Sequence, residues 1–138
     1  MQKCDVMQEC DVKFVLKKDF KEGNDNLFEL IVSVVMYDPK MMFFRLFANG
    51  ISDDVKRVQY AFTTDSIINI VNTIGISTYS VYVVEHVFGE LFNHESTHYD
   101  FNALKIYNNE FVEFMADVSK KLEITIDELI SPFNKNKC

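Results

Sequence analysis

The sequence predicts an α+β fold, in which an antiparallel β-meander of about four or five strands is followed by about four helices packed on one face of the sheet. Up to residue 62 apolar residues alternate with polar ones or form short runs, and after residue 64 they recur at helical spacing. The chain has 138 residues, 48% of them hydrophobic and 25% charged, which is typical of one globular domain. We expect that domain to span 12–133, between a frayed hexapeptide repeat at 1–11 and a loose tail at 134–138.

Four segments in the first half of the chain have strand character. Alternation of apolar and polar residues predicts a strand over 12–16. The run 27–37 is rich in β-branched and aromatic residues, which predicts a central strand covered on both faces. A further apolar strand is expected over 41–48, and Asn49-Gly50 after it is the dipeptide typical of a type I′ hairpin turn. Alternation over 57–62 predicts the fourth strand.

The spacing of apolar residues changes after this strand. Residues 65–74 have the pattern of a short helix, with Thr64 or Asp65 as its N-cap. Gly75 follows and can adopt the left-handed conformation that ends many helices. A first helix that ends at Gly75 is therefore expected.

The next two segments are less distinctive. Residues 79–93 place Val81, Val84 and Val87 on one helical stripe, which favours a second helix, although the strand propensity of the first half leaves a strand as the alternative. Residues 101–107 resemble a last strand. The sheet would then have a fifth strand between two helices.

Two helices are expected to close the domain. Residues 111–122 carry a clear apolar stripe, and Thr125 to Glu128 match a capping box that would open another helix before Pro132. Residues 118–130 resemble the helix-turn-helix segment of small phage-type repressors. A recognition helix with Asp127 and Glu128 at its start would direct carboxylates at phosphate, so we interpret the segment as a helical corner without DNA binding.

Charge and cysteine content restrict the function further. Lys and Arg number 14 against 21 Asp and Glu, a net charge of −7, whereas nucleic-acid surfaces need an excess of cations. The three cysteines lie near the termini, and an odd number does not make a disulfide framework. No apolar run approaches the length of a membrane span. We expect a cytoplasmic protein without direct nucleic-acid or membrane binding, and the sequence leaves its oligomeric state open.

Acidic residues are concentrated between residues 85 and 117, where seven carboxylates face one cation, Lys105. One interpretation is a solvated outer face that keeps the protein soluble. The other is an anionic surface for a basic partner, because complementary charge speeds association, as in inhibitors and immunity proteins that neutralise toxins or nucleases. The candidate partner-binding residues are Glu85, Glu90, Tyr99, Asp100, Tyr107, Glu110 and Glu113, with the two tyrosines as aromatic anchors.

One motif suggests catalysis. His94, Glu95 and His98 fit His-Glu-x-x-His, which on a helix places both imidazoles on one face as zinc ligands. Glu113 and Asp117 resemble the third-ligand helix of the gluzincin metallopeptidases. That resemblance implies that His94, His98 and Glu113 bind zinc, that Glu95 is the general base and that Asp117 supports a ligand.

The surroundings of this motif favour another interpretation. Asn93, Ser96 and Thr97 are poor helix formers, and the motif lies where a helix is expected to stop. In a loop the fixed geometry of the two imidazoles is lost, and the segment is a polar connector that binds no metal. The sequence therefore favours a protein-binding module without a cofactor, with a minimal zinc hydrolase as the alternative.

Overall fold

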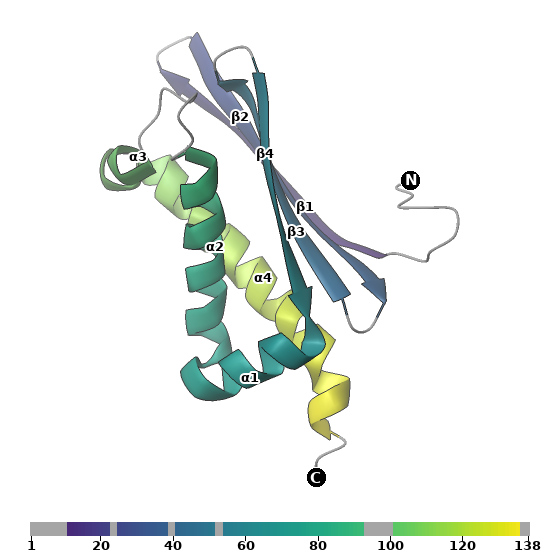
Figure 1. The fold of residues 1–138 in the computed structure, drawn as a ribbon. Helices are drawn as coiled ribbons and strands as arrows, with labels where there is room; N and C mark the ends of the chain where they lie inside the picture. The colour runs from purple at the N-terminus through teal and green to yellow at the C-terminus, as the bar shows by residue number, and fades with distance from the viewer. Residues whose placement is uncertain (1–10, 23–24, 39–40, 52–53, 93–100, 136–138) are drawn as a thin grey trace.

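The computed structural model describes residues 11–22, 25–38, 41–51, 54–92 and 101–135 (Figure 1). Its four strands are β1 (Asp11–Glu22), β2 (Asp25–Asp38), β3 (Met41–Ile51) and β4 (Asp54–Thr63). They pair in the order β1-β2-β3-β4, and every neighbouring pair is antiparallel. The predicted meander is confirmed, and its strands are longer than the sequence pattern indicated.

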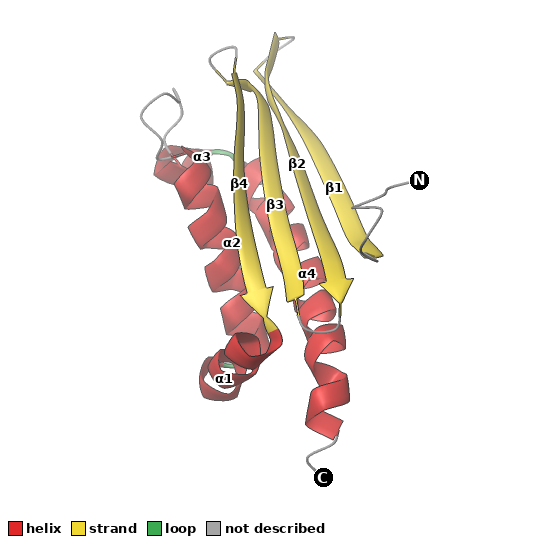
Figure 2. Ribbon diagram, turned by 45° about the vertical axis from the view of Figure 1, so that its right-hand side comes forward, coloured by secondary structure: helices red, strands yellow, loops and turns green. Residues whose placement is uncertain are grey.

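Four helices follow, namely α1 (Thr64–Ile74), α2 (Ile76–Phe92), α3 (Phe101–Tyr107) and α4 (Asn109–Lys135). They lie on one side of the sheet (Figure 2). The α+β fold class is therefore confirmed, and so is the helix predicted over 79–93 as far as Phe92, since Asn93 lies outside the described residues. Within the described residues no single helix has both the length and the apolarity of a membrane span, and only α1 and α2 taken together, bent by 115°, reach them.

Alternation decides which side chains of the sheet are buried. Leu30, Val32 and Leu46 point toward the helices and are fully buried. The intervening residues Ile31 and Ser33 of β2 are only half-buried. The expectation that this strand is covered on both faces was wrong, because all the helices lie on the same side of the sheet.

The hairpin between β3 and β4 also differs from the prediction. Asn49 and Gly50 belong to β3, which continues to Ile51, so this dipeptide does not form the predicted turn. Asn49 still has a partner, because it pairs with Glu29 of β2 and its Nδ2 donates to the Glu29 carboxylate at 3.1 Å. The pairing of β3 with β4 becomes irregular between Ala48 and Ile51 instead.

Helix α1 begins one residue earlier than expected. The N-cap is Thr63, whose Oγ1 accepts a hydrogen bond from the Ser66 N–H at 3.4 Å, and neither Thr64 nor Asp65 has this role. Gly75 has the predicted positive φ, 91°, but its ψ of 153° is extended rather than left-handed helical. The chain turns sharply there, and α2 starts at the next residue.

The predicted strand at 101–107 is a helix, α3. A strand would place Lys105 on the same face as Phe101, whereas one helical turn brings Phe101 and Leu104 to the core together. Ile106 and Tyr107 then lie at the surface. The helix satisfies the apolar pattern better than the strand, and within the described residues the sheet has four strands.

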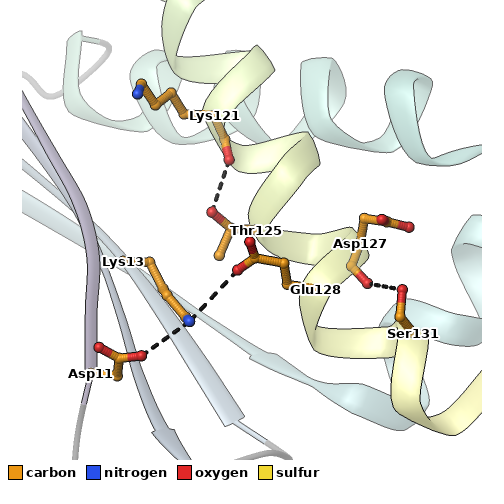
Figure 3. Close-up of polar contacts among 7 residues, drawn as sticks. All are labelled: Asp11, Lys13, Lys121, Thr125, Asp127, Glu128 and Ser131. Carbon is orange, nitrogen blue, oxygen red and sulfur yellow. Dashed lines mark hydrogen bonds and ion pairs between the residues drawn. The ribbon is translucent and has the colours of Figure 1, made fainter.

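The predicted corner near residue 125 does not exist, because α4 runs without a break from Asn109 to Lys135. Thr125 is not a cap. Its Oγ1 donates to the Lys121 carbonyl oxygen, one turn back in the same helix, at 2.8 Å (Figure 3). Leu122 and Ile126 lie one turn apart and are both fully buried, so a break between them would remove one from the core.

Phenylalanine rings join the two layers. Phe20 of β1 contacts Phe111 of α4 with ring centroids 5.7 Å apart. Phe111 also contacts Phe88 and Phe92 of α2, at 5.7 and 5.8 Å, and Phe101 of α3 at 6.0 Å. A single side chain therefore connects the sheet to three helices.

Candidate protein-binding surface

Large apolar side chains that remain exposed are concentrated on the helices. Within the described residues nine such side chains are exposed, and Val15 of β1 is the only one outside a helix. Val81 belongs to this exposed set, so its placement on the buried stripe of α2 was wrong. The full set is Val15, Ile70, Ile74, Val81, Tyr82, Ile106, Tyr107, Val112 and Ile124.

A cavity of about 590 Å³ lies between α2 and α3. Its lining combines rings, charges and amides, from Tyr82, Glu85, His86, Gly89, Glu90, Phe101, Asn102 and Lys105. Nζ of Lys105 lies 2.9 Å from the Glu85 carboxylate and 5.6 Å from the centre of the Phe101 ring. Two candidate residues, Glu85 and Glu90, are therefore brought to one cavity.

A second cavity, of about 300 Å³, lies between α2 and α4. Val81, Val112 and Met115 give it apolar walls, and Glu85 and Glu123 contribute carboxylates. Because Glu85 lines both cavities, they are neighbours on the outer side of the helices. Apolar side chains beside charged ones are typical of a protein-binding surface.

The carboxylates on the helices differ in their surroundings. Glu85 is paired with Lys105, and among the described residues the ion-pair partner of Glu90 is the His86 imidazole, 3.9 Å away. Glu110 lies 3.6 Å from Lys18 of β1, so it joins α4 to the sheet. Within the described part of the chain, Glu113 and Glu123 have no ion pair.

The remaining candidates in the described part of the chain do not line either of these two cavities. His94, Glu95, His98, Tyr99 and Asp100 lie outside the described residues, so the zinc site stays a prediction. Tyr107 and Glu113 are exposed on α3 and α4. No group of three His, Cys, Asp or Glu in the described ranges lies close enough together to hold a metal ion.

Charge is divided unevenly between the layers. Residues 11–63, which contain the strands, have eight acidic and eight basic side chains. Residues 64–138, which contain the helices, have eleven acidic and five basic ones. The excess of negative charge that the sequence showed therefore belongs mainly to the helical half.

Sequence reasoning identified the acidic residues and missed the apolar ones beside them. Tyr82, Ile106 and Val112 were not singled out, because apolar residues in a helix are more often buried. A signal was present, since the buried stripe of α4 through Phe111, Phe114 and Val118 leaves Val112 on the other side of the helix. Comparison with protein-family models, curated proteins and solved structures finds no match to the chain.

Proposed function

We propose that this protein is a small binding module that docks a basic protein partner, in the manner of an inhibitor or immunity protein of a toxin or nuclease. The docking surface is the outer side of α2, α3 and α4, which we call the helical face. It includes the exposed apolar residues Val81, Tyr82, Ile106, Tyr107 and Val112, the cavity-lining carboxylates Glu85, Glu90 and Glu123, and the exposed Glu113 of α4.

The observation that carries the proposal is the combination of exposed apolar side chains with carboxylates, Glu90 and Glu113, that have no Lys or Arg partner in the part of the chain that the structure describes. Apolar area removed from water supplies affinity, and Tyr82 and Tyr107 are the aromatic type enriched in binding hot spots. Glu90 and Glu113 keep their charge available to an incoming cation, which raises the association rate and orients the partner.

Not every acidic residue contributes equally. Glu110 already has Lys18 as a counterion, so a partner gains less from it. Glu85 already forms an ion pair with Lys105. Tyr99 and Asp100 remain candidate contacts on sequence grounds. The proposal therefore depends most on Glu90, Glu113 and the exposed apolar residues of the helical face.

A pair of charge reversals tests this surface. E90K/E113K reverses two carboxylates of the helical face, and D19K/D65K makes the same change in net charge on β1 and α1. Each tagged protein is incubated with lysate of the native host, and the partners retained at low and at high salt are quantified. We expect basic proteins to be retained by the wild type and the control, at least tenfold less by E90K/E113K, and less by all at high salt.

Equal retention by the two variants would contradict the proposal, because the effect would then follow net charge rather than location. Partners without a basic surface, or retention that is insensitive to salt, would contradict it as well.

A further inference from the structure

The side of the sheet that faces away from the helices, which we call the sheet face, is rich in cations and rings. Cross-strand pairing arranges its residues in rows, and two adjacent rows contain no carboxylate. These rows are Lys17, Ile31, Phe47 and Arg57, and then Val15, Ser33, Arg45 and Gln59.

Arg45 is held in one position on this face. Its Nε donates to Oε1 of Gln59 at 2.8 Å, and its Nη2 donates to the Tyr37 hydroxyl at 3.0 Å. The guanidinium carbon also lies 6.0 Å from the centre of the Tyr37 ring and 5.8 Å from that of Phe43. These contacts order the guanidinium and leave some of its five N–H donors for a further acceptor.

A cavity of about 410 Å³ adjoins this guanidinium and is lined by Arg45, Phe47, Arg57, Val58 and Gln59. Its volume lies in the range of small-molecule sites. Neither arginine forms an ion pair within the described residues. Two guanidinium groups without counterions therefore share one cavity with an aromatic ring.

The adjacent row contains two carboxylates, Asp19 and Glu29, and within the described residues neither forms an ion pair with these arginines. Glu29 accepts a hydrogen bond from Asn49, which holds the pKa of this carboxyl below its ordinary value, and it lies 3.5 Å from Nζ of Lys17. Glu29 is therefore paired with Lys17 and not with Arg45 or Arg57. No carboxylate of the described helices forms an ion pair with either arginine.

We infer that this cavity binds a small ligand that carries a carboxylate or phosphate group on a flat ring. The two guanidinium groups provide the fork of donors that recognises such oxyanions. Phe47 provides a surface on which a ring packs. The net charge of −7 opposes a long polyanion more than a small one, which is why a polynucleotide is not the ligand we infer.

The site is independent of the proposed function, because it lies on the opposite side of the molecule from the helical face. A failure of partner binding by the helices leaves this inference untouched, and the reverse also holds.

The test is an NMR titration of the full ¹⁵N-labelled chain with phenyl phosphate, inorganic phosphate and benzyl alcohol. With phenyl phosphate we expect saturable chemical-shift changes at Arg45, Phe47 and Arg57. Inorganic phosphate lacks the ring and should bind about tenfold more weakly. Benzyl alcohol should cause no shift changes, because it lacks the oxyanion that supplies most of the recognition. Equal binding of phenyl phosphate and inorganic phosphate would overturn the inference.

Variants locate the site. R57Q removes an exposed guanidinium and is expected to weaken phenyl phosphate about tenfold. K120Q makes the same charge change on α4 and is expected to change nothing. R45K keeps the charge but loses the fork, so weaker binding by a folded R45K protein is expected too. Equal effects of R57Q and K120Q would overturn the inference, as would a thymidine decamer that binds while phenyl phosphate does not.

Discussion

Each layer of the molecule has an outer surface that the other layer does not cover, and the two surfaces differ in charge and in polarity. The sheet face presents Arg45 and Arg57 beside aromatic rings, whereas the helical face presents carboxylates beside apolar side chains. The net charge of −7 is the total for the whole chain and does not show how charge is distributed between these two surfaces. Net charge describes only the average surface, so it does not exclude a local site for an anion. An acidic protein can therefore have a cavity lined by two arginines.

The largest change in stability is expected for a substitution between the sheet and the helices. Such a substitution also tests whether the two layers unfold together. F111A removes the ring that connects Phe20 of the sheet to α2 and α3. Because Phe111 is fully buried, we expect the free energy of unfolding to fall by about 3 to 5 kcal/mol in urea denaturation.

Y107A is the control for this change, since Tyr107 is 84% exposed and its loss should cost less than about 0.5 kcal/mol. Coincident unfolding of sheet and helices in both variants is expected. A separate transition for the sheet in F111A would show that the layers are independent units, contrary to the shared core.

The contact between α2 and the sheet can also be tested by raising the pH. Tyr79 of α2 packs against Phe62 of β4, and burial, followed by the influence of Tyr60, raises the pKa of Tyr79 to about 12. The unfolded chain loses this proton near pH 10 while the folded chain keeps it, so stability is lost as pH rises from 10 toward 12.

This difference of about two pKa units corresponds to about 2 to 3 kcal/mol of folding stability, which is present in full below pH 10. Y79F lacks the ionisable group, and its stability should depend less on pH in that window than that of the wild type. Denaturation at pH 9 and pH 11 gives the comparison. Parallel losses in the two proteins would mean that Tyr79 ionises as readily when folded.

The sheet could be predicted from sequence because alternation is a direct consequence of strand geometry, and four segments showed it or were continuously apolar. Alternation also identifies which side chains share a face, but it does not say which face the helices cover. For that reason Ile31 was expected to be buried and Arg45 was not considered as part of a site.

The helices were harder to predict, because local signals competed with packing. A capping box at Thr125 is a local preference, and the burial of Leu122 and Ile126 on one continuous helix outweighs it. Seven residues at 101–107 fit a strand or two helical turns equally well until the position of the core is known. The excess of acidic residues in this half could be counted from the sequence, whereas the exposure of Tyr82, Ile106 and Val112 required the fold.

The helical face includes residues along α4 and therefore depends on this helix being unbroken. Substitutions at Ile124 test whether it is unbroken. This residue is exposed near the position where the sequence predicted a break. In an unbroken helix I124G should be about 1 kcal/mol less stable than I124A, since glycine costs that much relative to alanine in a helix interior. Urea denaturation of both variants measures the difference, and equal stabilities would favour a break.

The smallest expected effect concerns the charges that face each other across the layers. Lys18 and Glu110 lie 3.6 Å apart, as do Lys13 and Glu128, so β1 and α4 are joined near both ends (Figure 3 shows the second pair). These side chains are partly exposed, so E110Q and E128Q should each cost at most about 0.5 kcal/mol at low salt and almost nothing in 1 M salt.

E113Q is the matched control, because Glu113 has no ion pair within the described residues and its replacement removes the same charge from the same helix. If E113Q costs as much stability as E110Q, the effect comes from the overall charge of α4 and not from its contact with β1. If only E110Q and E128Q respond to salt, the opposite charges of the two layers help to hold them together. The division of charge then has a structural role in addition to the role in binding that we propose.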